Sequence, residues 1–486
     1  MSLEGYAARS TVSERNPMTR TRVETDSIGS VTLPENADYG VHTARAIENF
    51  PITGVTLKDF PELVQSLAMT KKAAAMANVD LGALDQRRGQ AITRACDRVI
   101  AGEGHANFVV DMIQGGAGTS TNMNANEVIA NLALRELQRP AGDYKTIHPN
   151  DHVNLSQSTN DVYPTAVRLT MIRCCPALIV EQEALKAAFL VKAEEFHDII
   201  KVGRTQLMDA VPMRLGHEFR GFAVTLGEDI DRLREVANLL REVNLGGTAI
   251  GTGINTPEGY TESVIKHLSA VSGERMVVAG DLIEATSDMG AFITFSGVLK
   301  RIAVKLSKIC NDLRLLNSGP RAGFGEIKLP AVQAGSSIMP GKVNPVMPEV
   351  VNQIAYQVIG NDMTVTMAAE AGQLQLNAFE PVIVFNILQS MRMLTRGMKV
   401  LREKCIVGIE ADRERCQELL DHSLVAVTAI NPYIGYVEAS RVAKEALKSR
   451  RSVREVVLAE KLMTEAQLAE AFTTENLLGQ RKSVTP

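Results

Sequence analysis

Residues 219–240 read FRGFAVTLGEDIDRLREVANLL, and their apolar side chains recur at steps of three and four. Apolar residues at this spacing lie on one face of an α-helix, so the segment predicts a long helix that packs along its whole length. The stripe consists of Phe219, Phe222, Leu226, Ile230, Leu233, Ala237 and Leu240.

The stretches on either side show the same periodicity. It predicts further helices over roughly 164–198, 282–316, 349–376 and 382–404, each on the order of 40–50 Å long. Five long helices predict an elongated bundle, and the low aromatic content of 4% also favours helices over sheets. The predicted fold class is therefore all-α, with a central five-helix bundle.

Several of these helices are apolar on more than one face, as in residues 291–295. A helix that is apolar all round must be buried on all sides, which predicts that the bundle associates with copies of itself. We expect three domains, of which the bundle is the central one, and a tail. The tail is 1–18, the N-terminal domain 19–157, the bundle 158–412 and a small helical C-terminal domain 413–486.

Composition excludes several classes of partner. The net charge is −4, with 52 basic and 56 acidic residues, so no electrostatic attraction to nucleic acid or membrane surfaces is expected. No apolar run is long enough to span a membrane, and the first residues lack the apolar core of a signal peptide. The six cysteines form no CxxC, which predicts a reducing, cytoplasmic location.

Four polar stretches interrupt the apolar pattern, and we expect each to precede a helix. They are GGAGTSTNMN (115–124), SQSTNDVYP (156–164), GRTQLMDAVP (203–212) and AGSSIMPGKVNPVMP (334–348). Pro164, Pro212 and Pro348 would then occupy first helical turns. Each stretch alone is typical of a helix cap. Together, helix N-termini with hydroxyl groups and one lysine suit a small substrate with two carboxylates.

Cofactor and metal sites are not indicated. The Gly335–Gly341 segment fails the P-loop pattern, because five residues separate its glycines and Val343 stands where a Ser or Thr is needed. Gly251 and Gly253 lack the third glycine of a dinucleotide fingerprint. His148 and His152, the one close histidine pair, lie in a predicted loop. We expect no cofactor and no metal.

The segment GSSIMPGKVNP (335–345) resembles the GSSxMPxKxNP signature of the aspartase/fumarase superfamily. GTSTNMN, QSTND, GRTQLMDAVP and IEATSD (283–288) occur in the family's order, and the likeness runs from about Arg22 to the C-terminus. YGVHTARAIENF (39–50), VNLGGTAIGTGINTP (243–257) and NDMTVTMAAEAGQLQLN (361–377) are similar to the ammonia-lyase branch that acts on aspartate. The resemblance implies a homotetramer in which the bundles of four subunits merge into one core.

This resemblance also implies a reaction and its residues. The reaction is the reversible deamination of L-aspartate to fumarate and ammonia through an enediolate, with Ser336 as general base on a mobile loop. Ser337 is the rival for that role. The substrate-binding residues would be Thr119, Ser158, Thr159, Asn160, Thr205, Gln206, Ser337, Lys342 and Asn344.

Two alternatives differ in chemistry from this reading. A class II fumarase shares the fold and the intermediate, but fumarases place a histidine, paired with a glutamate matching Glu349, where this chain has Gln206. A non-catalytic member would keep the bundle alone, and the intact Ser336 and Lys342 argue against it. An up-and-down bundle would separate the stretches at Pro164 and Pro212 by about 45 Å within one chain, which predicts active sites shared between subunits.

Overall fold

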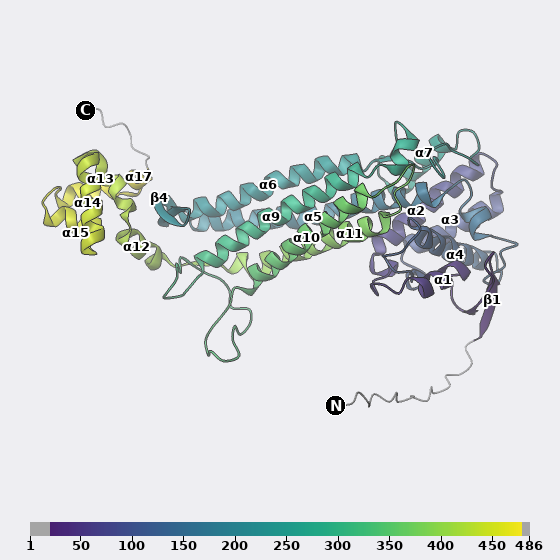
Figure 1. Cartoon of the computed structure of the whole chain (residues 1–486), viewed down its shortest axis with the longest axis horizontal. Helices are drawn as coiled ribbons and strands as arrows, with labels where there is room; N and C mark the ends of the chain where they lie inside the picture. Colours follow the sequence, from purple (N-terminus) through teal and green to yellow (C-terminus); the bar gives the residue numbers. More distant parts are fainter. Residues whose placement is uncertain (1–19, 479–486) are drawn as a thin grey trace, which may run out of the picture. The chain divides into compact units, whose positions relative to one another are not determined.

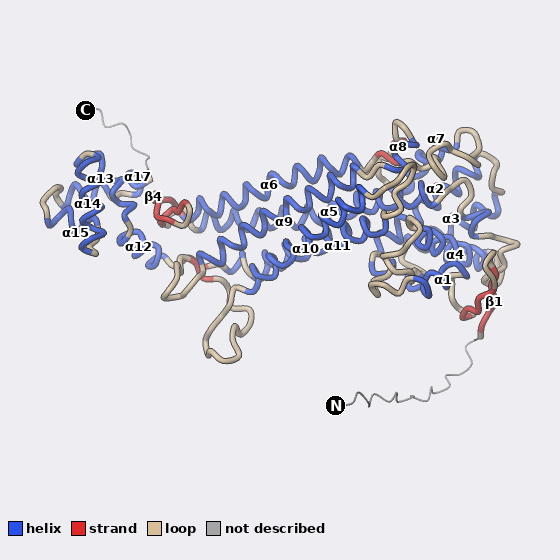
Figure 2. Tube along the Cα trace, viewed as in Figure 1, coloured by secondary structure: helices blue, strands red, loops and turns tan. Residues whose placement is uncertain are grey.

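A computed structural model describes residues 20–478 of the chain. Within these residues the structure has seventeen α-helices, while the strands are short and pair two by two (Figures 1 and 2). The predicted all-α class is confirmed. The chain divides into two compact units. Of the described residues, the first unit holds 20–173, Leu239–Phe292 and Val365–Phe385, and the second holds the rest.

The first unit is built around helix α2 (Pro61–Asp80), whose alanine-rich surface lets other helices approach closely. Helices α3 (Gln86–Ile100), α4 (Thr119–Glu136) and α7 (Tyr260–Ser272) pack against it. The unit also contains β1 (Thr21–Thr25), β2 (Ser30–Pro34), α1 (Val41–Asn49), β5 (Glu242–Val243), β6 (Val277–Val278) and α8 (Leu282–Ser287).

Five long helices have most of their residues in the second unit. They are α5 (Thr159–Glu195), α6 (Leu215–Leu239), α9 (Gly290–Leu316), α10 (Val346–Glu370) and α11 (Glu380–Lys404). Each stands where the sequence predicts a helix, except that the predicted 282–316 helix is interrupted at Asp288 and Met289 and becomes α8 and α9.

Side-chain contacts in the second unit join these five helices into a closed ring. The ring runs α5–α6–α9–α10–α11 and back to α5, so it is a five-helix bundle, as predicted. The contacts are Gln182 with Leu226, Lys305 with Asp229, Asn352 with Ser307, Asn361 with Ser390, and Arg402 with Glu181.

The predicted stripe of α6 lies inside the bundle. Phe219, Leu226 and Leu233 are fully buried, whereas Ala237 is only partly buried. Phe189 of α5 packs edge-on against Phe222 and at a tilt against Phe219, with 5.6 and 6.1 Å between ring centroids. Burying each such side chain stabilises the fold by about 1.5–3 kcal/mol.

The second unit also holds the C-terminal helices and two small sheets. These are β3 (Ile200–Thr205) with β4 (Met208–Arg214), β7 (Ile327–Lys328) with β8 (Glu410–Ala411), α12 (Arg413–His422), α13 (Val427–Ile434), α14 (Tyr436–Ser449), α15 (Val453–Ala459), α16 (Glu465–Ala471) and α17 (Thr474–Leu477). Ile430, Val442, Val456 and Leu468 form a small core there. The domain boundaries at 157 and 412 stay a prediction, and the expected tail 1–18 lies outside the described residues.

None of the helices in residues 20–478 is long and apolar enough to cross a membrane.

Candidate active site

Thr119 is the first residue of α4, where a tight turn delivers it. Gly116, Ala117 and Gly118 all have positive φ, and a Cβ on Gly118 would lie 2.5 Å from the ring of Tyr163. Only glycine therefore fits before Thr119. The Thr119 hydroxyl donates to the Gly116 carbonyl at 2.7 Å. Its remaining lone pairs can accept a hydrogen bond from a substrate.

At the start of α5, two hydroxyl groups accept hydrogen bonds from the protein, whereas the Thr119 hydroxyl donates one. Ser158 Oγ accepts from the Asn160 N–H at 3.2 Å, and Thr159 Oγ1 accepts from Asn122 Nδ2 at 3.0 Å. Each hydroxyl keeps its own hydrogen available, so both can donate to a carboxylate. Asn160 Nδ2 donates to the Ala249 carbonyl at 2.7 Å, which fixes the side chain and leaves its Oδ1 as an acceptor.

Pro164 is not in the first helical turn, contrary to the prediction, because α5 already begins at Thr159. Its missing N–H leaves the Asn160 carbonyl without the usual helical donor. Asn244 Nδ2 supplies the hydrogen bond instead, at 2.9 Å. Because Pro164 has no N–H, the Asn160 carbonyl is available to Asn244, and this hydrogen bond attaches the VNLGG segment (243–247) to the first turn of α5.

Asp161 holds the first turn of α5 in place through backbone hydrogen bonds. Its fully buried carboxylate accepts from the N–H groups of Ser158, Gly246 and Thr248 at 2.9–3.0 Å. Burial raises the pKa of Asp161 to about 6, against the lowering effect of these backbone donors. Asp161 thus binds the start of α5 and the 244–248 turn into one rigid support for Ser158 and Thr159.

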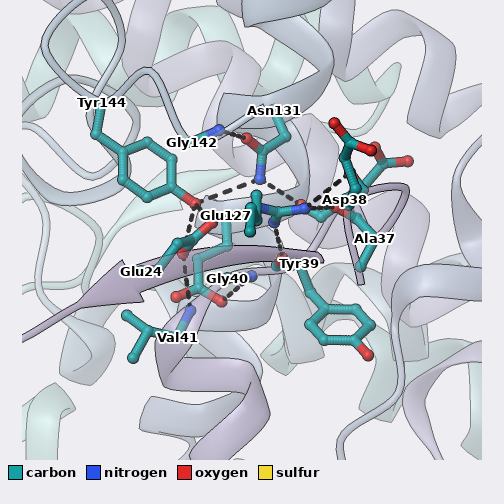
Figure 3. A network of polar contacts seen from close by, with 12 residues as sticks. Glu24, Ala37, Asp38, Tyr39, Gly40, Val41, Glu127, Asn131, Gly142 and Tyr144 are labelled. Atoms are coloured by element: carbon teal, nitrogen blue, oxygen red, sulfur yellow. Dashed lines mark hydrogen bonds and ion pairs between the residues drawn. The ribbon is translucent and has the colours of Figure 1, made fainter. Parts of the chain in front are cut away.

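A second buried network fixes the N-terminal segment on α4 (Figure 3). Glu127 of α4 accepts from the N–H groups of Gly40 and Thr43 and from the Thr43 hydroxyl. Glu24 accepts from Val41 N and Tyr144. A Cβ on Gly40 would lie 2.6 Å from Glu24 Oε2, so only glycine fits at this position of the YGVHT motif.

Thr205 and Gln206 lie on a β-hairpin in the second unit. Thr205 ends β3, and Gln206 and Leu207 form a two-residue turn in which both have positive φ. The prediction that Pro212 begins a helix is wrong, because Pro212 lies in β4 opposite Val202 and α6 begins only at Leu215.

The base of this hairpin is held by a buried carboxylate. Arg204, next to Thr205, donates to fully buried Glu326 at 2.8 Å, and Lys201 lies 2.8 Å from the other oxygen of that carboxylate. The Arg204 guanidinium also stacks on the Phe324 ring, 4.1 Å from its centroid. Thr205 is therefore tied to the segment that leads into the 335–345 loop.

Ser336 accepts two backbone hydrogen bonds from its own loop. Its Oγ lies 3.2 Å from the N–H nitrogen of Ile338 and 2.9 Å from that of Met339. Two fixed dipoles aimed at one oxygen favour its negatively charged form. Both donors come from residues of the same loop, two and three positions after Ser336.

The neck of the same loop is closed by backbone contacts. Gly335 N donates to the Lys342 carbonyl at 2.9 Å, and Asn344 Nδ2 donates to the Gly335 carbonyl at 2.6 Å. A Cβ on Gly335 would lie 2.5 Å from the Lys342 carbonyl oxygen, so only glycine fits. Lys342 is exposed, and Pro348 lies in the first turn of α10 as predicted.

The predicted site residues thus form two groups. Thr119, Ser158, Thr159 and Asn160 belong to the first unit, and Thr205, Gln206, Ser336, Ser337, Lys342 and Asn344 belong to the second. In the first group, Asn122 of α4 joins the helix of Thr119 to Thr159. In the second group, Thr205 and Gln206 are consecutive in the hairpin, and Ser336, Ser337, Lys342 and Asn344 share one loop.

Sequence reasoning missed the buried polar residues that support the first group, among them Lys71, Asn122 and Asp161. The run NMNANE (122–127) carried a signal, since a helix with so many amides on buried positions must satisfy them with distant partners. His148 and His152 have structural contacts. His148 Nδ1 accepts from the Asn150 and Asp151 N–H groups, and His152 Nδ1 accepts from His148 N.

Comparisons with known proteins cover nearly the whole chain. A family model described as lyase matches residues 29–360, and one described as fumarase C C-terminus matches residues 427–479. Aspartate ammonia-lyase from Pseudomonas aeruginosa is 58% identical over 467 residues, which cover 96% of this chain and 98% of that protein.

Solved structures give the same picture. Fumarate lyase:delta crystallin from Brucella melitensis bound to cobalt is 58% identical with a TM-score of 0.90, covering 93% of this chain and 100% of its own. Recombinant class II fumarase from Schistosoma mansoni is 34% identical with a TM-score of 0.89, covering 95% of this chain and 100% of its own.

Proposed function

The chain belongs to the lyase family that includes aspartases and class II fumarases, and on this premise we propose that it is an aspartate ammonia-lyase. It would convert L-aspartate reversibly to fumarate and ammonia. The curated aspartate ammonia-lyase quoted above shares 58% of its residues with the chain over nearly the full length of both. The class II fumarase shares 34%.

The arrangement of Ser336 carries the chemical part of the proposal. Deamination requires removal of a weakly acidic proton from the carbon beside the β-carboxylate, and an ordinary serine hydroxyl is too weak a base. An oxygen that already accepts two backbone N–H groups at 2.9 and 3.2 Å is suited to carry negative charge. Ser336 is therefore the proposed base. Ser337, next in the chain, would bind substrate.

The enediolate intermediate carries two negative charges on the β-carboxylate, beside the carbon that loses its proton. Donors that are fixed before the reaction stabilise such charge by several kcal/mol in a site that excludes water. Ser158 and Thr159 have free hydroxyl hydrogens for this purpose, and Lys342 and Asn344 would bind a carboxylate from the loop. Closure of that loop would exclude water.

The leaving amino group needs acceptors instead of donors. Thr119 presents lone pairs because its hydrogen is bound by Gly116, and Asn160 presents Oδ1 because its Nδ2 is bound by Ala249. Thr205 and Gln206, on the hairpin turn, would complete the site. Gln206 in place of a histidine favours the ammonia-lyase over the fumarase.

The decisive experiment compares the two substrates directly. Fumarate formation from L-aspartate and from L-malate is followed by ultraviolet absorbance on the same purified protein. We expect turnover of L-aspartate and at most a trace with L-malate. Efficient malate dehydration would make the chain a fumarase, and inactivity with both would favour the non-catalytic alternative.

We also propose a homotetramer with active sites shared between subunits. Tyr356, Ile359 and Met363 form an exposed apolar stripe on α10, with 59%, 37% and 61% of each side chain accessible. A stripe at helical spacing on a bundle helix suits another copy of the bundle. Sedimentation should give the mass of four 52.7 kDa chains, and a monomer mass would refute this.

A further inference from the structure

Lys71 of α2 lies fully buried beside the segment that carries Ser158 and Thr159, although no step of the proposed reaction uses it. Its Nζ donates to Asn154 Oδ1 at 2.7 Å and to Gln157 Oε1 at 2.9 Å. Both partners are amide oxygens, so Lys71 donates to both whether or not it is protonated. The amide of Asn154 must therefore present its oxygen to Lys71.

The orientation of Asn154 decides the orientation of Asn122. Asn154 Nδ2 is occupied by the Gln157 carbonyl at 3.1 Å, while Asn154 Oδ1 also accepts from Asn122 Nδ2 at 3.1 Å. If Asn122 were rotated, its oxygen would face another oxygen. Asn122 keeps its amino group on this side even though its own buried Oδ1 then has no hydrogen-bond partner among the described residues.

The same amino group decides the role of Thr159. Asn122 Nδ2 donates its second hydrogen to Thr159 Oγ1 at 3.0 Å. Thr159 must accept here, so its own hydrogen is directed elsewhere, and no acceptor for it occurs among the described residues. Lys71 thus fixes Asn154 Oδ1 as an acceptor, and this acceptor fixes Asn122 Nδ2 as the donor to both Asn154 and Thr159.

From this chain of contacts we infer that Lys71 and Asn122 are positioning residues that hold the Thr159 hydroxyl as a hydrogen-bond donor to the substrate carboxylate. The inference rests on the proposed function and deepens it. Neither residue touches substrate. Without Lys71 the Asn122 amide can turn over and offer its oxygen to the Thr159 hydrogen, and without Asn122 the hydroxyl loses the donor that orients it. In both cases part of the binding of the developing enediolate is lost.

Asn126 offers a matched control for Asn122. It lies one helical turn further along α4, is equally buried and donates to the same Asn154 Oδ1 at 3.2 Å, but it does not contact Thr159. We expect Asn122→Ala to lower kcat/KM for L-aspartate on the order of 10- to 100-fold, the effect of one hydrogen bond to a charged group. Asn126→Ala should lower thermal stability similarly while changing kcat/KM by less than about threefold.

Lys72 serves as the control for Lys71. Its Nζ donates to Asp97 Oδ1 at 2.6 Å, and it makes no contact with Asn154 or Gln157 in the described hydrogen bonds. Lys71→Met should lower kcat/KM in the same direction as Asn122→Ala, and Lys72→Met should not. If Asn122→Ala fails to fold, Asn122→Asp replaces it, because a carboxylate at this position can only accept and would draw the Thr159 hydrogen toward itself.

A double-mutant cycle separates positioning from general structural damage. Thr159→Val removes the hydroxyl that Asn122 is proposed to orient. The double variant Asn122→Ala/Thr159→Val should therefore have nearly the same kcat/KM as Thr159→Val alone. Additive effects of the two changes, or equal losses in Asn122→Ala and Asn126→Ala, would overturn the inference while leaving the aspartate assay intact. Loss of the proposed function itself would show differently, as absence of aspartate turnover by the unaltered protein.

Discussion

Glu380, the first residue of α11, should make the stability of this protein fall as pH rises. Its carboxyl group is almost completely buried, and Oε1 has no hydrogen-bond partner among the described residues. Burial raises the pKa of Glu380 to about 8, and the nearby positive charge of Arg168 offsets only part of this effect. Folded Glu380 is therefore largely protonated at neutral pH.

The sign of the effect follows from proton counts. Between its ordinary pKa of 4.5 and the folded value of about 8, the folded state binds more protons at Glu380 than the unfolded state. Stability from this group is fully present below the lower value and is lost as pH rises through the higher one. At 1.36 kcal/mol per pH unit, the span corresponds to about 5 kcal/mol as an upper bound.

Glu380→Gln keeps the shape of the side chain and removes its titration. We expect the variant to match the unaltered protein near pH 5 and to exceed it by a few kcal/mol in unfolding free energy near pH 9. Urea or thermal unfolding should be measured at one fixed protein concentration, because self-association also stabilises the fold. Glu262→Gln, on the exposed side of α7, serves as the control. Equal pH slopes for Glu380→Gln and the unaltered protein would refute the reasoning.

Three further changes test the proposed reaction. Ser336→Ala should reduce kcat to below a few per cent with fold and assembly intact by circular dichroism and sedimentation, and higher residual activity would move the base to Ser337 or elsewhere. Lys342→Met should raise KM and lower kcat together, since a carboxylate contact acts in ground and transition states; a change in protein yield alone would make Lys342 structural. Gln206→His should not by itself give efficient malate dehydration, because distinguishing an ammonium from a hydroxyl needs several acceptors.

The bundle could be predicted because its information is local. A stripe such as Phe219 to Leu240 fixes a helix and its buried face without knowledge of any other segment. The hairpin at 200–214 could not be predicted in this way. Its turn residues Gln206 and Leu207 adopt positive φ without glycine or asparagine, and Pro212 fits a strand only because the two-stranded sheet leaves its edge free.

The candidate site also has one part built from local contacts and another built from contacts between distant segments. The loop around Ser336 is built from contacts within eleven residues, so its backbone donors could be anticipated from GSSIMPGKVNP. The support beneath Thr159 joins residues 71, 122 and 154, and such partners have no signature in sequence until the chain is folded. Buried amides in NMNANE indicate that a network exists, but they do not name its other members.

Subunit sharing of the active site can be tested by complementation. Thr159 begins α5, and Thr205 follows the other end of the same continuous helix of 37 residues, which is about 55 Å long. One small substrate cannot reach both ends of that helix, so the two groups of site residues should come from different chains.

Ser336→Ala and Thr159→Ala proteins, each of low activity alone, should therefore gain activity above either one when they are unfolded and refolded together. With random assembly at equal amounts, about a quarter of the sites would draw an intact Ser336 from one chain and an intact Thr159 from another. Ser336→Ala mixed with Lys342→Met is the control. Each site takes Ser336 and Lys342 from the loop of one chain, so every site of a hybrid carries one change and the mixture should not exceed the average of the two separate proteins. If hybrids form at every ratio and the first mixture stays as inactive as the control, Ser336 and Thr159 act within one chain and the helix-length argument fails.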